Sequence, residues 1–143
     1  LNVQVLWQCG KIYFEQYRYL NSKENIHVHA FIDEMNLAYA HADIIISRAG
    51  ASSISELCIV GKPVIFIPSP NVAENHQYKN AKNLVIKNAA VLIEEKNLET
   101  DFVKSFTDLI NNTEYQLELS NSIIKNAKPN ATTEIVNEIE KLL

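Results

Sequence analysis

The residues best suited to chemistry in this sequence follow a short apolar run at positions 44–46. They form a turn of small residues, Ala49 to Ser53, where the pattern changes from strand to helix. The first amides of a helix lack partners within it, and the helix dipole adds positive charge there, so a phosphate suits the position. The alternative is that Ser53 merely caps the helix, a contribution of about 1 kcal/mol. The spacing alone favours neither reading.

Two charged residues flank this turn. Glu56 lies one helical turn further on, where a carboxylate can accept two hydrogen bonds from a vicinal diol such as that of a ribose. Its alternative is a reciprocal capping bond with Ser53, since the two have capping-box spacing. Arg48 is suited to a phosphate, or to a structural ion pair with Glu56 or Asp43. There is no P-loop lysine and no complete GxGxxG pattern, so the sequence has no nucleoside triphosphate signature.

A second polar group, Asn75, His76 and Gln77, follows another apolar run at 64–67. These side chains offer donors and acceptors to a ligand, although simple solvent exposure is the more common role for loop residues of this kind. A single histidine is weak evidence for a general base. The other histidines are scattered without the spacing of a metal site, and we expect no metal and no cofactor. Cys58 falls on an apolar helix face and is expected in the core.

The elements that must position these residues alternate between strand and helix. Strand patterns occupy 3–7, 26–31, 44–46, 64–67 and 90–93. Helical patterns occupy 11–20, 34–41, 53–60 and 77–87, and three more follow, with a second capping box at Thr113–Gln116 and a last apolar stripe at 135–143. Gly61 fits a helix C-cap.

This alternation predicts an α/β fold, a Rossmann-like parallel sheet with flanking helices. The continuous apolar run at 44–46 predicts a strand buried on both faces. Ligands of such sheets bind beyond the carboxyl ends of the strands. The loops at Gly10, 31–35, 47–53 and 68–77 all follow strands. We therefore expect them to gather at one edge and form the binding site.

Composition narrows the class of protein. The chain has 143 residues, 47% hydrophobic and 21% charged, which suits one globular domain spanning 1–143. A formal charge of −4 without a long basic run argues against a nucleic-acid partner. Two cysteines, no CxxC and no secretory segment favour a reducing, cytoplasmic compartment. No apolar run has the length of a membrane span.

Several blocks resemble the MurG family of bacterial glycosyltransferases. They are Phe31–Met35, Ala42–Ala51, Ser55-Glu56, Gly61-Lys62-Pro63, Pro68 and His76–Ala81, and the similarity covers nearly the whole chain in order and spacing. The family moves N-acetylglucosamine from its UDP donor onto a lipid-linked muramoyl-pentapeptide in peptidoglycan synthesis, which serves cell-wall growth, cell shape and cell division. The resemblance implies the C-terminal, donor-binding half of a GT-B enzyme of the inverting hexosyltransferase class.

The resemblance also implies individual roles. Ile32 would read the uracil through its backbone and Met35 would line that pocket, while the amides of Ala51, Ser52 and Ser53 would meet the diphosphate and Glu56 the ribose. Together with Arg48, His76 and Gln77, these are the expected substrate-binding residues, the last two at the sugar. His76 departs from the glutamine of the family, and Ser52-Ser53 replaces a Leu-Thr pair of some members. No catalytic residue is expected here.

The family pattern implies parts that this sequence does not show. An N-terminal domain would hold the lipid acceptor, and a first strand with a Gly-rich phosphate loop would precede Leu1. We expect strands 3–7 and 44–46 to lie on either side of that missing strand, and either to pair directly or to be joined by another chain, which includes self-association through open edges. The parent would sit peripherally on the inner face of the bacterial membrane, and this chain alone would be inactive.

Other readings stay open at this point. The alternatives are the donor-binding subunit of a two-chain N-acetylglucosaminyltransferase and another GT-B enzyme such as a nucleotide-sugar epimerase, although no convincing acid–base pair for an epimerase is present. The plainest reading is an α/β module without a ligand. Flat titrations with every UDP-sugar would support this last reading, and co-purification with a separate acceptor subunit would support the two-chain enzyme.

Overall fold

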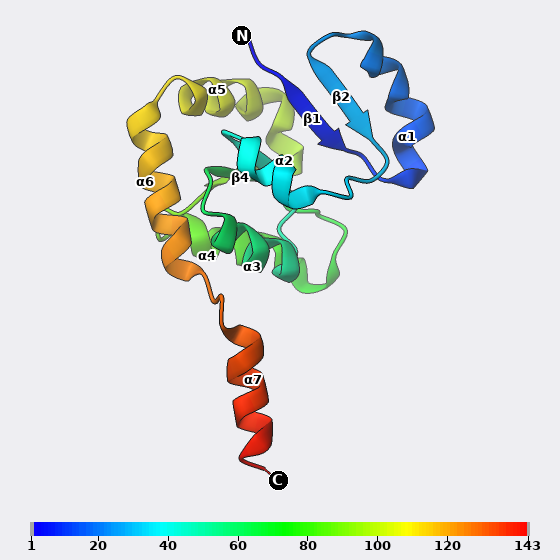
Figure 1. The fold of residues 1–143 in the computed structure, drawn as a ribbon. Helices are drawn as coiled ribbons and strands as arrows, with labels where there is room; N and C mark the ends of the chain where they lie inside the picture. The colour runs from blue at the N-terminus through cyan, green and yellow to red at the C-terminus, as the bar shows by residue number, and fades with distance from the viewer. Residues whose placement is uncertain (1, 143) are drawn as a thin grey trace. The chain divides into compact units, whose positions relative to one another are not determined.

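The computed structural model describes residues 2–142, and the chain divides between His41 and Ala42 into two compact units. Figure 1 follows both along the chain, from blue at the N-terminus to red at the C-terminus. The assignment of residues 1–143 to one donor-binding domain therefore stays a prediction.

The first unit is a βαβα segment. Its elements are β1 (Val5–Gln8), α1 (Lys11–Tyr17), a 3-10 helix (Arg18–Ser22), β2 (Ile26–His29) and α2 (Met35–His41). The two strands are parallel, in a register that pairs Val5 with Ile26 and Gln8 with His29. Asn21 holds β2 from outside the ladder, because its side chain accepts from the Val28 amide at 2.6 Å and donates to the Val28 carbonyl at 3.2 Å.

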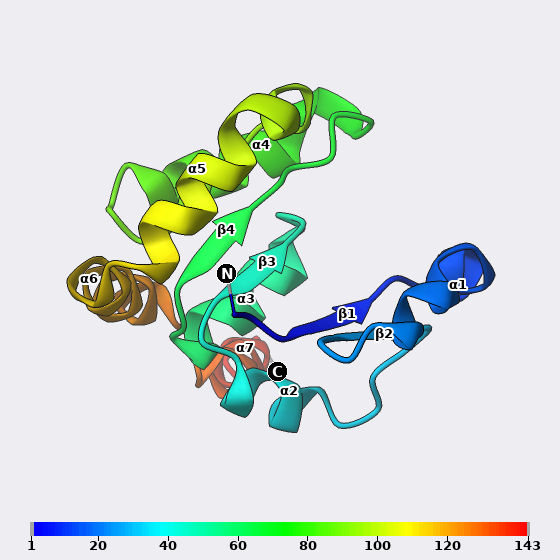
Figure 2. The same cartoon turned by 90° about the horizontal axis from the view of Figure 1, so that it is seen from above.

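The second unit carries the larger sheet. Its elements are β3 (Ile45–Ser47), α3 (Ala51–Val60), β4 (Val64–Phe66), a 3-10 turn (Ala73–Asn75), α4 (His76–Val85), β5 (Val91–Leu92), a 3-10 turn (Glu95–Asn97), α5 (Leu98–Ile110), α6 (Thr113–Ile123), a 3-10 turn (Ile124–Asn126) and α7 (Ala131–Glu140). The strand order is β3-β4-β5, all parallel, and Figure 2 shows β3 and β4 side by side.

The core of the second unit lies around its central strand. All three residues of β4 are fully buried, as their unbroken apolar run predicts. Ile65 and Ile93 pack against Leu109 of α5 and Leu119 of α6, so these two helices cover the strands. Gly61 ends α3 in the left-handed conformation, with φ +69°, which confirms the predicted C-cap.

Every strand predicted from the sequence is present within three residues at each end, and the parallel α/β class is confirmed. One burial prediction is wrong. Ile46 of β3 is 46% exposed, whereas a strand buried on both faces was expected. The reason is that β3 is an edge strand among the described residues and its central side chain is left uncovered on one face.

Each unit has a sheet of its own. Among residues 2–142, β1 pairs only with β2, and β3 pairs only with β4. The expectation that β1 and β3 pair directly concerns strands of two different units and stays a prediction. Completion by another chain is untested. Within the same range no helix is long and apolar enough to cross a membrane.

Candidate functional site

The turn after β3 is held by two amide side chains of α4. The side-chain oxygen of Gln77, Oε1, accepts from the backbone N–H of Ala49 at 3.3 Å and from that of Ser69 at 2.9 Å. Asn80 donates through Nδ2 to the carbonyl oxygen of Ala49 at 3.3 Å. Ala49 is completely buried. Gln77 thus links the two loops that follow β3 and β4. These loops lie at the carboxyl ends of the strands, as the predicted topology requires.

The first turn of α3 leaves its amides free of any capping side chain. Gly50 is the N-cap residue, with extended φ −64° and ψ 151°, and no side chain bonds to the first amides of the helix. The Ile54 N–H closes the first turn on the Gly50 carbonyl at 2.9 Å. The predicted capping box from Ser53 to Glu56 is therefore wrong, since the helix begins two residues earlier, at Ala51, and Ser53 lies inside its first turn.

Glu56 lies on the exposed side of α3. Ser52 and Ser53 are four and three residues before it, so they share its face of the helix, while Leu57 and Cys58 are buried on the other side. No hydrogen bond or ion pair of the Glu56 carboxylate to any described residue is found. Of the two roles open to Glu56, the reciprocal bond to Ser53 is thus not made, and the carboxylate is accessible to a ligand.

Arg48 has a structural partner that the sequence did not indicate. Its guanidinium donates to the Ile67 carbonyl at 3.2 Å and forms an ion pair with Glu95, which follows β5. Neither Glu56 nor Asp43 is the partner. The pair joins the carboxyl ends of three strands, but both side chains are more than a third exposed, so its contribution to stability is small.

The loop before α4 has an unusual backbone. Glu74 and Asn75 both have positive φ, at 53° and 54°, which non-glycine residues rarely adopt. His76 begins α4, and its Nδ1 bonds to the Ala73 carbonyl at 2.8 Å. Because a carbonyl oxygen only accepts, Nδ1 carries a proton in this hydrogen bond, and Nε2 has no bond to a described residue. Two consecutive residues in this conformation come directly before His76 and Gln77. Strained backbone of this kind is often found in loops that form binding sites.

The first unit holds the remaining predicted residues. Ile32 lies just after β2 and Met35 begins α2, both half-buried. The Ile32 N–H donates to the side-chain oxygen of Gln8, the last residue of β1, at 2.8 Å. Gln8 was missed in the sequence reading. Its place at the carboxyl end of a predicted strand was the available signal.

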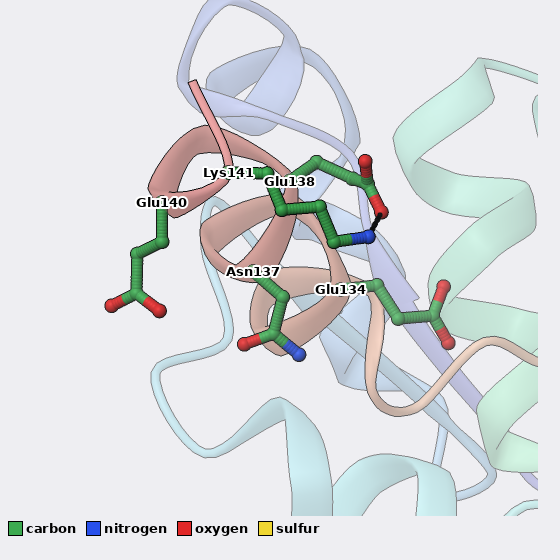
Figure 3. A pocket seen from close by; sticks show the side chains of 5 residues that line it. All are labelled: Glu134, Asn137, Glu138, Glu140 and Lys141. Atoms are coloured by element: carbon green, nitrogen blue, oxygen red, sulfur yellow. Dashed lines mark hydrogen bonds and ion pairs between the residues drawn. The ribbon is translucent and has the colours of Figure 1, made fainter. Parts of the chain in front are cut away.

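Other features of the chain add no chemistry of their own. Among residues 2–142 no group of three His, Cys, Asp or Glu side chains is placed to hold a metal. Burial raises the pKa of Cys58, as expected for a core thiol, and Lys87 opposes it weakly. Figure 3 shows a shallow hollow lined by five residues of the C-terminal segment: Glu134, Asn137, Glu138, Glu140 and Lys141. Lys141 pairs there with Glu138, and none of the predicted site residues takes part.

Comparison with known proteins defines the class. The chain belongs to the family described as glycosyltransferase family 28 C-terminal domain, whose model matches residues 1–135. The chain spans about two fifths of the length of the curated relatives it matches.

Those relatives share one name, UDP-N-acetylglucosamine--N-acetylmuramyl-(pentapeptide) pyrophosphoryl-undecaprenol N-acetylglucosamine transferase. The protein of Flavobacterium psychrophilum is 57% identical over 142 residues, which is 99% of this chain and 39% of that protein. The protein of Christiangramia forsetii is 52% identical over 141 residues, 99% of this chain and 38% of that protein.

A solved structure gives the same result for the fold. The crystal structure of Acinetobacter baumannii MurG matches with a TM-score of 0.83 and 30% identity, over 99% of this chain and 42% of that chain. The predicted fold, the C-terminal half of a GT-B glycosyltransferase, is thereby confirmed.

Proposed function

We propose that this chain is the donor-binding part of an enzyme that transfers N-acetylglucosamine from UDP-N-acetylglucosamine to a lipid-linked muramoyl-pentapeptide in peptidoglycan synthesis. The observation that carries the proposal is the uncapped start of α3 beside the unpaired Glu56 carboxylate. The shared name of the close relatives supports the choice of donor and acceptor.

The second unit supplies groups for the diphosphate and the ribose. The amides of Ala51, Ser52 and Ser53 lie in the first turn of a ten-residue helix, where no intrahelical carbonyl is available to them and the dipole favours negative charge. Glu56 follows one turn later on the same exposed face, at a rise of about 5 Å. That spacing suits a ligand whose anionic group is adjacent to a sugar diol.

The start of α4 is assigned to the transferred sugar. The Gln77 carbonyl oxygen already accepts two backbone N–H groups, so both of its lone pairs are in use. Its Nε2 group is left to donate to a sugar hydroxyl. His76 stands in place of the family's glutamine and offers its second ring nitrogen, Nε2, to the sugar. Arg48 adds positive charge nearby, reduced by its pairing with Glu95.

The first unit is assigned to the base. Ile32 is proposed to read the uracil through its backbone, with Met35 lining the pocket. Because the Ile32 amide donates to Gln8, a base carbonyl would have to displace that side chain, whereas the Ile32 carbonyl oxygen needs no such exchange.

Catalysis is proposed to need the rest of the parent enzyme. Glycosyl transfer with inversion requires a base for the acceptor hydroxyl and stabilisation of the leaving UDP. The residues named above serve only the second requirement, so the isolated chain is expected to be inactive. We place the parent in the cytoplasm, peripherally on the inner face of the membrane, and no cofactor is part of the proposal.

The open edges of β1 and β3 support a proposal of self-association. Unpaired strand edges offer backbone groups to another chain. Sedimentation analysis of the chain at increasing concentration is expected to show a dimer or larger species. A monomer at all concentrations would contradict this proposal without affecting donor binding.

The decisive experiment titrates UDP-N-acetylglucosamine into the wild type, Glu56→Ala and the control Glu134→Ala by calorimetry. Glu134 is an exposed glutamate of α7 in the same unit. Loss of hydrogen bonds to a charged group predicts about 10- to 100-fold weaker binding for Glu56→Ala. Glu134→Ala should bind as the wild type does.

A deoxy analogue makes the same test specific for the ribose. Replacing UDP by 2′-deoxy-UDP should weaken binding to the wild type but hardly change binding to Glu56→Ala, since that variant has already lost the diol contact. No saturable binding of either UDP ligand by the folded wild type would overturn the proposed function. If the change from UDP to 2′-deoxy-UDP weakens binding equally in the wild type and in Glu56→Ala, only the proposed ribose role of Glu56 is contradicted.

A further inference from the structure

The inner face of α4 changes from polar to apolar along the helix. Gln77, Asn80, Ala81 and Leu84 follow one another at the spacing of a single helical face. Ala81 and Leu84 are buried, while Gln77 and Asn80 are half-buried at the beginning of the same stripe. Two amide side chains therefore stand where an ordinary amphipathic helix would carry apolar residues.

Both amide side chains form hydrogen bonds to the backbone of one residue, Ala49. Gln77 accepts from the Ala49 N–H, and Asn80 donates to the Ala49 carbonyl. The N–H of Ala49 belongs to the peptide group shared with Arg48, and its carbonyl to the peptide group shared with Gly50. One face of α4 thus fixes two successive peptide planes of the turn that follows β3.

Fixing the second plane also fixes the Gly50 amide. A trans peptide group is planar, so its N–H points away from its C=O. When Asn80 holds the Ala49 carbonyl toward α4, the Gly50 N–H must point to the other side. Gly50 is the N-cap of α3, and its N–H is among the four amides that a helix leaves without an internal partner.

We propose that Asn80, with Gln77, is a positioning residue that orients the Ala49–Gly50 peptide so that the Gly50 N–H joins the amides of α3 in binding the donor diphosphate. This inference rests on the proposed function for its ligand. Asn80 itself does not contact the ligand. Asn80 instead sets the direction of the Gly50 N–H. Replacing Asn80 should therefore weaken the binding of ligands that carry phosphate and leave the binding of other ligands unchanged.

The test compares UDP with uridine, which has the base and ribose but no phosphate. The variants are Asn80→Ala and, as a matched control, Asn83→Ala, which removes an exposed asparagine from the same helix. Losing one oriented hydrogen bond predicts about 3- to 10-fold weaker UDP binding for Asn80→Ala, with uridine binding unchanged. Asn83→Ala should change neither. Asn80→Ser, which keeps a shorter donor, should fall between the wild type and Asn80→Ala.

A ligand-free measurement separates this inference from the proposed function. The amide resonance of Gly50 should shift in Asn80→Ala and not in Asn83→Ala. If the wild type binds no UDP, the proposed function fails, and the Gly50 resonance still reports whether Asn80 sets the turn. An unchanged Gly50 resonance, or equal losses of UDP and uridine affinity in Asn80→Ala, would overturn the inference. If Asn80→Ala does not fold, the same comparisons are made with Asn80→Ser.

Discussion

At the scale of single residues, the two glycines at the ends of α3 differ in backbone conformation. Gly61 has φ +69°, a left-handed conformation that favours glycine, while a Cβ there would meet Ile124 at 3.4 Å, an ordinary contact distance. Gly50 has an ordinary φ of −64°, and a Cβ there would meet only Ser53 Oγ at 3.8 Å. Nothing within the described chain therefore excludes a side chain at Gly50, so a substitution there tests the proposed approach of the diphosphate to this position.

Gly50→Ala is therefore expected to fold with a free energy of unfolding within about 1 kcal/mol of the wild type but to bind UDP more weakly. Gly61→Ala is the reciprocal control, and should lose about 1–2 kcal/mol of stability from its left-handed conformation while the folded protein keeps its affinity. Urea unfolding and UDP titration of both variants make the comparison. Unchanged UDP affinity in Gly50→Ala would show that the position is not near the ligand.

The Cys58 thiol gives a prediction for pH dependence. Burial raises its pKa in the folded protein, so the neutral thiol is favoured there. The unfolded thiol ionises near its ordinary pKa, about 8.5. The stability linked to the neutral thiol is complete below that pH and is lost as the pH rises through the higher folded pKa. Wild type should therefore lose stability relative to Cys58→Val between pH 7 and pH 10, measured by urea unfolding. A constant difference would contradict the buried-thiol account.

At the scale of elements, the start of α6 shows how a sequence pattern can give the right helix and the wrong cap. Thr113 and Gln116 have capping-box spacing, but the cap is Asn112, whose Oδ1 accepts from the Tyr115 N–H at 2.9 Å. Gln116 instead donates to the carbonyls of Leu109 and Ile110 at the end of α5. Carbonyls in the last turn of a helix have no donor four residues on, and here Gln116 adds to the backbone bond from the Asn112 N–H to the Leu109 carbonyl at 3.3 Å.

Asn112→Ala should therefore destabilise the chain by about 1 kcal/mol, the usual loss for a side-chain N-cap. Thr113→Ala is the matched control and should change the free energy of unfolding by less than about 0.5 kcal/mol. Chemical denaturation of the two variants distinguishes the caps. A larger loss in Thr113→Ala than in Asn112→Ala would restore the capping box that the sequence suggested.

Some features of the candidate site can be predicted from local sequence patterns, and others cannot. The turn at Ala49, the exposed Glu56 and the start of α4 follow from strand ends and helical spacing, which are local. The partners Glu95 for Arg48 and Gln77 for Ala49 lie 47 and 28 residues away. No local period encodes them, because they depend on which strand ends become neighbours. Sequence reasoning therefore located the residues and missed their partners.

At the scale of the whole molecule, helix α7 stands out from the rest of the second unit by its burial. The helix contains no buried residue, and its apolar side chains Ile135, Val136 and Ile139 are 60%, 46% and 53% exposed. Helices α3 to α6 each bury at least one residue in the core. A ten-residue helix without tertiary packing is marginal in water, since helical stability in proteins comes mostly from packing.

Deleting residues 131–143 should therefore change the free energy of unfolding of the remaining chain by less than about 1 kcal/mol, because stabilisation scales with the apolar area buried. Amide hydrogen exchange gives the matching measurement on the intact chain. The amides of α7 should exchange much faster than those of α5, whose last turn contains the fully buried Leu109. Protection of α7 equal to that of α5, or a large loss of stability on deletion, would mean that its apolar face is covered in solution.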